Sequence, residues 1–143
     1  ICRNGRHVQP EFAHKYVEQI AYGVDFTARD VQNQLKDKGH PWEIAKGFDH
    51  SAGLSEFMNM ADLNNAEHIQ FHLDLNGETV QNGNTKNLIF TFNTLIVYIS
   101  KFFKLQQGDI IYTGTPAGVG PVKIGDKLEG YIEDKKMLSC DIK

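Results

Sequence analysis

Four polar side chains with complementary chemistry occur in one short segment of the chain, which carries Asp25, Arg29, Asp30 and Gln32. Arg29 and Gln32 are three residues apart and therefore share one face if the segment is helical. A carboxylate can hold a hard cation, a guanidinium can bind a carboxylate through two hydrogen bonds, and an amide can orient it. The combination predicts a site for a metal ion and an anionic substrate. The alternative is that Asp25 or Asp30 caps a helix and that Arg29 is a surface charge.

Lys46 is a second candidate, because it lies between the apolar residues Ile44-Ala45 and Phe48. A lysine among apolar neighbours loses part of its solvation and becomes useful as an electrophile or a proton carrier. The alternative is a surface lysine whose ammonium group reaches water.

The glycine-rich segment 113–121 is a third candidate. Its glycines could present backbone N–H groups to an anion, and Thr115 would add a hydroxyl donor. The segment lacks the Gly-Lys-Ser/Thr ending of a P-loop, so it does not predict a nucleotide site. The alternative is a tight turn between strands.

The histidines and cysteines give a weaker signal. None of the six histidines forms a ligand pair on a predicted helix face: His68 and His72 fall on the polar face of a predicted strand, and His50 lies in a predicted loop. Cys2 and Cys140 lie near opposite ends of the chain. Two free thiols, as in a reducing cytoplasmic compartment, are favoured over a single terminal bridge.

The elements that must position these side chains follow from the spacing of apolar residues. This spacing predicts a short helix over 10–20, with a proline in its first turn, and a strand over 20–24. Thr27 to Asp30 has the form of a capping box, which predicts a second helix that ends at Gly39. Asp25 would then lie between a strand end and a helix N-terminus, where a scaffold fixes a functional group but leaves it open to solvent.

The rest of the chain is predicted to be richer in strands than in helices. Residues 47–56 lack periodicity and are predicted to form a loop. Alternation over 69–75 predicts a half-buried strand, and Asn76-Gly77 predicts a type I′ hairpin turn after it. A buried helix is expected over 85–103, followed by strands and turns that begin with a strand at 108–112.

The composition is that of an ordinary soluble globular protein. Hydrophobic residues make up 41% and charged residues 23% of the 143 residues, and the net charge is -3. No basic stripe is present, so nucleic acid is not expected as a partner. The longest apolar stretch, 88–103, is too polar to span a bilayer, so a membrane is not expected either. No repeat or linker divides residues 1–143, which are predicted to form one α+β domain rich in β-structure.

Four segments carry a resemblance to a known family. They are Asp25-Phe-Thr-Ala-Arg-Asp-Val-Gln32, Gly39 to Asp49, Asn76 to Gln81 and Gly108 to Pro121. In this order they resemble the signature of the fumarylacetoacetate hydrolase family, and its acylpyruvase and oxaloacetate-decarboxylase branch in particular. The resemblance covers essentially the whole chain. It implies a fold of rolled mixed β-sheets with flanking helices, and a homodimer.

The resemblance also implies roles for individual residues. In the family, the position of Asp25 holds a Mg²⁺ or Mn²⁺ ion together with two glutamates of a Glu-x-Glu motif. The positions that contact or activate a small α-keto acid or diketo acid substrate are those of Arg29, Gln32, Lys46 and Thr115. Lys46 is expected to be the catalytic residue among them, and Asp30 is assigned a structural role as a capping residue.

The chain departs from the family pattern in its acidic residues. No Glu-x-Glu precedes Asp25, and the family's His-x-x-Glu pair, which activates water in the hydrolases and would lie further upstream, is also absent before Asp25. We therefore expect residues 1–143 to be the C-terminal two-thirds of a longer catalytic domain, with the two glutamate ligands upstream of Ile1.

The expected function is metal-dependent hydrolysis of a carbon–carbon bond in an acylpyruvate or a related β-diketo acid. The metal ion and the positive side chains would stabilise the enolate that forms beside the keto group. The same chemistry gives two alternatives. One is decarboxylation or tautomerisation of oxaloacetate, and the other is isomerisation or hydration of an enol diacid of aromatic catabolism. A non-catalytic binding module with the same fold is the remaining alternative.

Overall fold

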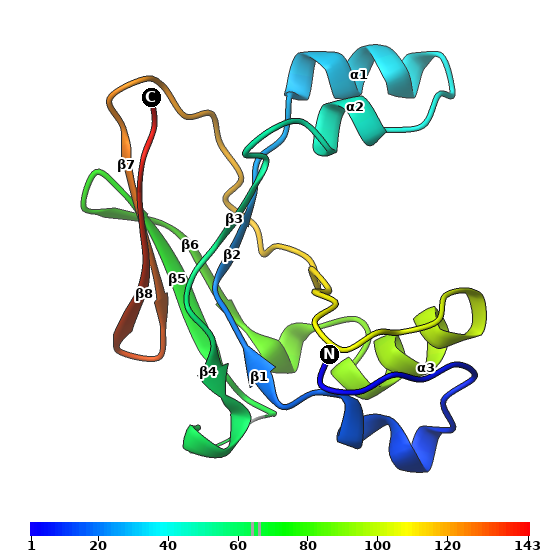
Figure 1. Ribbon diagram of the computed structural model, residues 1–143. Coiled ribbons are helices and arrows are strands. Elements are labelled where there is room, and N and C mark those ends of the chain that lie inside the picture. Colours follow the sequence, from blue (N-terminus) through cyan, green and yellow to red (C-terminus); the bar gives the residue numbers. More distant parts are fainter. Residues whose placement is uncertain (64, 66) are drawn as a thin grey trace.

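The computed structural model describes residues 1–63, 65 and 67–143 as a four-stranded sheet, two two-stranded sheets and two helical parts (Figure 1). The strands are β1 (Gln19–Ile20), β2 (Gly23–Asp25), β3 (Ala52–Leu54), β4 (Met58–Asn59), β5 (Gln70–Leu75), β6 (Glu78–Asn84), β7 (Lys127–Ile132) and β8 (Lys135–Asp141). The helices are α1 (Arg29–Asp37), α2 (Glu43–Lys46) and α3 (Phe92–Phe102), with 3-10 helices η1 (Pro10–Tyr16), η2 (Met60–Asp62) and η3 (Thr85–Asn87). The predicted α+β class is confirmed.

Strands β5 to β8 form an antiparallel sheet in the order β6-β5-β7-β8. The turn between β5 and β6 is the one predicted, since Asn76 and Gly77 have φ angles of 53° and 84°. A type I′ turn requires positive φ at both central residues, and Asn-Gly meets that requirement at little cost. Every strand pairing in the described part of the chain is antiparallel, and no closed barrel forms there.

The larger apolar core lies on one face of this sheet. Its buried members are Tyr22, Ile69, Leu73, Leu128, Ile132 and Leu138. Ile69 and Leu73 are an even number of residues apart and point to the same face, as the predicted alternation requires. Gly130 leaves room for the Tyr22 ring, because a Cβ at that position would lie 2.5 Å from it. The sheet and the chain segment that carries β1 and β2 are therefore packed together.

The strand predicted at 20–24 is two short strands. β1 pairs with β4, and β2 pairs with β3. The prediction of a loop over 47–56 is therefore wrong in part, because β3 lies within it. Its small residues carry no alternating pattern, and pairing with a distant segment of the chain makes them a strand.

Helices α1 and α2 pack on each other as an arm beyond the ends of β2 and β3 (Figure 1). Ala45 is completely buried between them. Two backbone hydrogen bonds join the base of the arm, from Phe26 N to Ser51 O at 2.8 Å and from Ala28 N to Ala45 O at 3.1 Å. Helix α1 ends before Gly39, which has a φ angle of 64°, as predicted.

The predicted capping box at the start of α1 is wrong. The N-cap residue is Ala28, and no side chain caps the helix. Thr27 instead donates its hydroxyl to the Asp25 carbonyl at 3.3 Å and accepts a hydrogen bond from Lys46. Asp30 lies exposed in the first turn, where its charge is placed favourably for the helix dipole without capping the helix.

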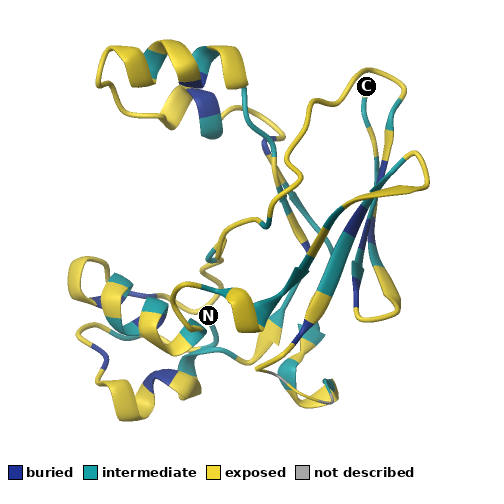
Figure 2. Ribbon diagram, turned by 180° about the vertical axis from the view of Figure 1, so that it is seen from behind, coloured by how far each residue is buried: buried dark blue, intermediate teal, exposed yellow. Residues whose placement is uncertain are grey.

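Helix α3 packs on η1 in a second, smaller core made of Val8, Ala13, Ile96 and Leu105. The helix begins at Phe92 rather than near residue 85, because the Thr91 hydroxyl accepts a hydrogen bond from Thr94 N and supplies the N-cap. The prediction of a buried helix is wrong for its outer face. Tyr98 and Phe102 are 59% and 61% exposed, and Figure 2 shows burial on one side only.

Among the described residues, no helix is both long and apolar enough to cross a membrane. Cys2 and Cys140 are both free and half-buried, which agrees with the prediction of two free thiols.

Residues 110–122, here called the crossing segment, run from the α3 region to β7 without joining a sheet (yellow to orange in Figure 1). The predicted strand at 108–112 is therefore wrong in the part of the chain that the structure describes. The residues Ile110, Ile111 and Tyr112 favour an extended backbone, but a strand also needs a neighbour to pair with, and the described residues supply none.

Candidate active site

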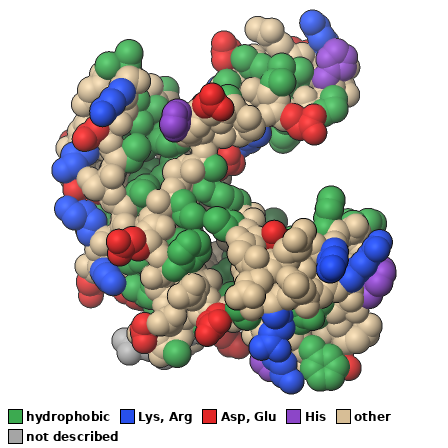
Figure 3. Space-filling model, in the orientation of Figure 1, with side chains coloured by type: hydrophobic (Ala, Val, Ile, Leu, Met, Phe, Trp, Pro, Cys, Tyr) green, Lys and Arg blue, Asp and Glu red, His purple; other side chains and the backbone are tan. Residues whose placement is uncertain are grey.

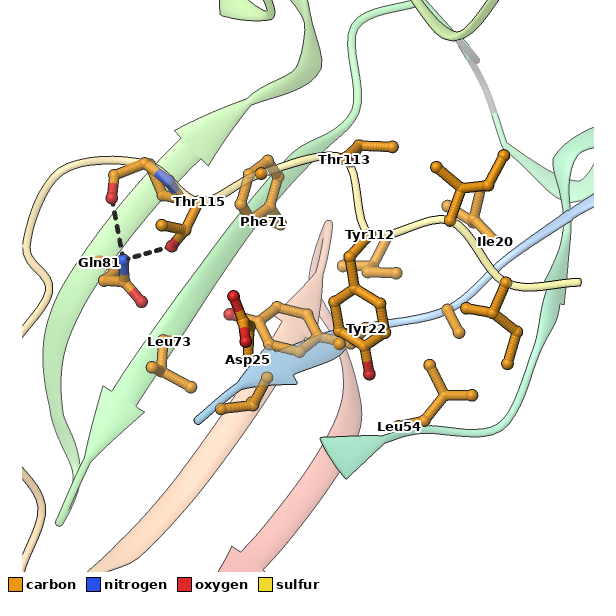
Figure 4. Close-up of a pocket in the computed structure, with 18 of the residues that line it drawn as sticks. Ile20, Tyr22, Asp25, Leu54, Phe71, Leu73, Gln81, Tyr112, Thr113 and Thr115 are labelled. Carbon is orange, nitrogen blue, oxygen red and sulfur yellow. Dashed lines mark hydrogen bonds between the residues drawn. The ribbon is translucent and has the colours of Figure 1, made fainter. Parts of the chain in front are cut away.

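A cavity of about 890 Å³ lies between β2, the sheet and the crossing segment. The space-filling view shows the molecule hollowed between the α1–α2 arm and the α3 region (Figure 3). The polar side chains that line the cavity include Asp25, Thr27, Arg29, Lys46, Gln81 and Thr115. In Figure 4, Asp25 projects from β2, while Thr115 and Gln81 come from the crossing segment and β6.

Lys46 is directed toward Asp25 and not toward open solvent. Its Nζ donates to Asp25 Oδ2 at 2.7 Å and to Thr27 Oγ1 at 2.7 Å. The two charged side chains are 33% and 48% exposed, and an ion pair with that exposure stabilises a fold by about 1 kcal/mol or less. An ammonium group carries three N–H donors, so one donor remains for a molecule in the cavity.

Arg29 and Gln32 lie on one face of α1, as predicted. Arg29 Nη1 donates to Gln32 Oε1 at 2.6 Å. Gln32 is only 7% exposed and does not line the cavity, whereas Arg29 does. The buried amide therefore fixes the guanidinium at one nitrogen and leaves its other N–H groups to bind an anion. A direct contact between Gln32 and a substrate stays a prediction.

Thr115 faces the same cavity from the crossing segment. Gln81 Nε2 donates to Thr115 Oγ1 at 2.9 Å and to the Pro116 carbonyl at 3.0 Å (dashed lines in Figure 4). Strand β6 thereby fixes the position of Thr115. A tight turn between strands, the alternative for this segment, would not need such a contact.

Two tyrosines form part of the cavity wall. Burial raises the pKa of Tyr22 to about 12, and the Asp74 carboxylate adds to the effect. Burial, and then the nearby Asp25 carboxylate, raise the pKa of Tyr112, whose hydroxyl donates to Gly53 O at 3.0 Å. Both phenols are therefore protonated at neutral pH.

The described residues do not by themselves make a complete metal site. Among them, no group of three or more His, Cys, Asp or Glu side chains lies close enough together to hold a metal ion. Asp25 presents one carboxylate to the cavity, and one of its oxygens accepts a hydrogen bond from Lys46. No histidine lines the cavity in the described part of the chain. Asp25 can thus be one ligand of a divalent cation, and no more of that site is present.

The structure brings four of the five predicted site residues to one cavity, namely Asp25, Arg29, Lys46 and Thr115. Thr27, Gln81 and Tyr112 are also part of the site but were not predicted as site residues. All three lie inside segments that carry the resemblance, and this was the one signal that they belong to the site. The roles of Thr27 and Gln81 depend on contacts with Lys46 and Thr115, which are distant in sequence.

Comparison with known proteins places the whole chain in one group. Residues 1–143 match the family model described as Fumarylacetoacetate (FAA) hydrolase C-terminal. A mitochondrial oxaloacetate tautomerase from Mus musculus is 40% identical over 143 residues, which are 100% of this chain and 65% of that protein. An oxaloacetate tautomerase from Escherichia coli is 42% identical over 124 residues, which are 86% of this chain and 57% of that protein.

A solved structure gives the same result for the fold. The crystal structure of fumarylpyruvate hydrolase from Pseudomonas aeruginosa in complex with Mn²⁺ and pyruvate superimposes with a TM-score of 0.93 at 34% identity. The match covers 99% of this chain and 61% of that one. The chain therefore spans less than two-thirds of the length of these relatives, which agrees with the expectation of a C-terminal portion.

Proposed function

Because the chain belongs to the fumarylacetoacetate hydrolase C-terminal family, we propose that it is part of an enzyme acting on a small α-keto acid. The first candidate reaction is keto–enol tautomerisation of oxaloacetate, the activity named for the relatives from Mus musculus and Escherichia coli. The observation that carries the proposal is the convergence of Asp25, Arg29, Lys46 and Thr115 on one cavity.

Arg29 and Thr115 are proposed to bind the substrate. Oxaloacetate carries two carboxylates, and a guanidinium binds a carboxylate through two parallel hydrogen bonds. Gln32 already holds Arg29 by one of its nitrogens, which reduces the side-chain entropy lost on binding. Thr115 adds a hydroxyl donor from the other wall of the cavity.

Lys46 is proposed to stabilise the developing enolate. In tautomerisation a base takes a proton from the carbon beside the carbonyl group, negative charge gathers on the keto oxygen, and protonation of that oxygen gives the enol. The third N–H of Lys46 can donate to that oxygen while Asp25 and Thr27 hold the other two. A donor that is already held in place needs little reorganisation as the charge develops, and this is what makes it effective.

A divalent cation, Mn²⁺ or Mg²⁺, is proposed as the cofactor. The support is the Mn²⁺ and pyruvate in the fumarylpyruvate hydrolase complex from Pseudomonas aeruginosa. When bound, such an ion acts as a Lewis acid on the keto oxygen. Asp25 would be one ligand, and the others would come from outside residues 1–143.

Hydrolysis of an acylpyruvate, the reaction expected from the sequence, is the second candidate. The name of the same Pseudomonas enzyme favours it. The two reactions share the enolate and differ in whether water attacks a second carbonyl group. The residues described here serve either reaction, so the assay must compare oxaloacetate with fumarylpyruvate and acetylpyruvate.

Assembly and location belong to the same proposal. A homodimer is proposed on the family resemblance, and the exposed aromatic side chains of α3 are compatible with it. The expected cytoplasmic location stays a prediction, since the relative from Mus musculus is named as mitochondrial.

The test compares two lysine variants of the intact protein. Lys46→Met removes the donor at the keto oxygen and should lower kcat/KM for oxaloacetate tautomerisation by about 10²–10³-fold. Lys38→Met, at the exposed C-cap of α1, removes the same charge outside the cavity and should leave the rate unchanged. Equal rates for the two variants, or no turnover of any of the three acids by the unmodified protein, would exclude the proposed function.

A further inference from the structure

Gln81 is the side chain through which β6 holds the crossing segment. For residues 110–122 the described part of the chain supplies side-chain hydrogen bonds at two places only, from Gln81 to Thr115 and Pro116 and from Tyr112 to Gly53. No backbone hydrogen bond ties these residues to a strand in that part of the chain. Of these hydrogen bonds, those from Gln81 are the ones made at Thr115 itself and at its neighbour Pro116.

The backbone of the crossing segment also lies directly against β6 at this point. A Cβ at Gly118 would lie 2.1 Å from Val80 O, and the φ angle of Gly118 is 100°. Glycine permits both the approach and the backbone conformation. Gln81, the next residue on β6, is thus brought within reach of Thr115 and Pro116.

The two hydrogen bonds fix which way the Gln81 amide faces. The Pro116 carbonyl can only accept, so the NH₂ end of the amide must point to it. The same NH₂ group lies 2.9 Å from Thr115 Oγ1, so the Thr115 hydroxyl accepts there. A hydroxyl has one proton to donate, and in the described residues no hydrogen bond uses the proton of Thr115.

We propose that Gln81 is a positioning residue that turns Thr115 into a hydrogen-bond donor for an anionic oxygen of the substrate. Gln81 does this by occupying the acceptor side of the hydroxyl and by holding Pro116 against β6. The identity of the substrate as an α-keto acid rests on the proposed function, whereas the anchoring of the crossing segment does not.

The first experiment measures the binding of pyruvate to the intact protein with Mn²⁺ by calorimetry. Gln81→Met keeps the size of the side chain but removes both hydrogen bonds, and should weaken binding about three- to tenfold. Gln81→Glu keeps the shape but replaces the NH₂ donor by an acceptor oxygen. The carboxylate would accept a hydrogen bond from the Thr115 hydroxyl, which then could not donate to the substrate, and would repel the Pro116 carbonyl oxygen. It should weaken binding further, about ten- to a hundredfold.

A matched control uses a glutamine elsewhere on the same sheet. Gln70 on β5 is exposed, lies outside the cavity lining, and has no side-chain hydrogen bond among the described residues. Gln70→Met should bind pyruvate as the unmodified protein does. Equal weakening by Gln70→Met and Gln81→Met would overturn the proposal.

A double-mutant cycle separates positioning from general damage. In a Thr115→Val background the hydroxyl is gone, so Gln81→Met should add less than about twofold to the loss of pyruvate binding. If the two losses multiply instead, Gln81 does not act through Thr115 and the proposal fails.

Limited proteolysis tests the anchor without any substrate. A broad-specificity protease should cut within residues 110–122 about three- to tenfold faster in Gln81→Met than in Gln70→Met, because local opening sets the rate. If the unmodified protein does not bind pyruvate, the proposed function fails, and the cleavage rates still decide the role of Gln81. Cleavage at the same rate in both variants would overturn that role. Gln81→Glu, which matches the original shape, gives the same comparison if the methionine variant does not fold.

Discussion

The sheet β5–β8 and the crossing segment are held in place in opposite ways. In the sheet, β5 pairs with a strand on each side and Leu128 and Ile132 of β7 are almost completely buried. In the crossing segment, no residue pairs with a strand in the described part of the chain, and Val119 is 62% exposed. Its position comes from the hydrogen bonds that Gln81 donates to it, from the close approach of Gly118 to Val80 of β6, and from the hydrogen bond between Tyr112 and Gly53.

The difference teaches where a mutation should act. Backbone pairing and apolar burial make the sheet a source of stability, so changes there should alter the free energy of unfolding. The crossing segment contributes little burial but carries Thr115, so changes there should alter binding and turnover. The first and third of the four predictions below test this division, and the four are given from the largest effect to the smallest.

The largest effect is expected in the sheet core. Leu128 is 2% exposed, and Leu128→Ala should lower the free energy of unfolding by about 2–5 kcal/mol, through lost burial and the cavity left behind. Val119→Ala in the crossing segment should change it by less than about 0.5 kcal/mol. Urea denaturation of the intact protein measures both. Similar values for the two variants would contradict the division.

The second effect depends on pH and on Tyr22. An unfolded tyrosine has a pKa near 10, and burial raises the pKa of Tyr22 to about 12 in the folded protein. Between these values the folded state keeps a proton that the unfolded state loses, so stability falls as pH rises from about 10 to about 12. The fall should amount to about 3 kcal/mol at most.

Two phenylalanine variants isolate this term. Tyr22→Phe has no proton to lose and should lack that part of the fall in stability, whereas Tyr98→Phe, at an exposed position on α3, should keep it. Denaturation at a series of pH values measures the difference. Parallel curves for the unmodified protein and Tyr22→Phe would contradict the assignment.

The third effect is expected on turnover and at the crossing segment. Gly118→Ala places a Cβ against the Val80 carbonyl and strains a φ angle of 100°, so the segment must move away from β6. We expect kcat/KM for the α-keto acid to fall about tenfold, a cost typical of a strained backbone position. Gly120→Ala is the control, because its Cβ would meet nothing within 4 Å. Equal kinetics for the two variants would argue that contact with β6 does not set the site.

The smallest effect compares the starts of two helices. Thr91 caps α3 through Thr94 N, whereas no side chain caps α1 at Ala28. Thr91→Ala should lower the free energy of unfolding by about 1 kcal/mol, the usual value of such a cap. Ala28→Gly, at the uncapped start of α1, should cost less. The order of the two denaturation midpoints checks the prediction, and a reversed order would contradict it.

The sequence predicted those parts of the fold that depend on neighbours in the chain. The Asn76-Gly77 turn, the alternation that follows Ile69, and the end of α1 before Gly39 were all predicted correctly. Each depends on local backbone preferences or on a period of two residues. The shared face of Arg29 and Gln32 was predicted correctly for the same reason.

The errors fall where distant residues decide the local structure. Thr27 has the form of a helix cap, but Lys46 and the Asp25 carbonyl take its hydroxyl instead. β3 exists because β2 pairs with it, and residues 108–112 form no strand because nothing in the described chain pairs with them. Thr115 was predicted as a hydroxyl donor from its place in the glycine-rich segment, but its hydrogen bond with Gln81 was not predicted, because it joins residues that are 34 positions apart.

One of the two free thiols lies in the sheet, and the other lies in the part of the molecule that contains η1 and α3. Cys140 is part of β8 in the sheet, and Cys2 lies beside η1, where its N–H donates to Tyr16 O. With a donor dye on one thiol and an acceptor dye on the other, energy transfer would measure the distance between these two parts of the molecule. Energy transfer between them would report how the α3 region moves relative to the sheet, with no residue of the cavity altered.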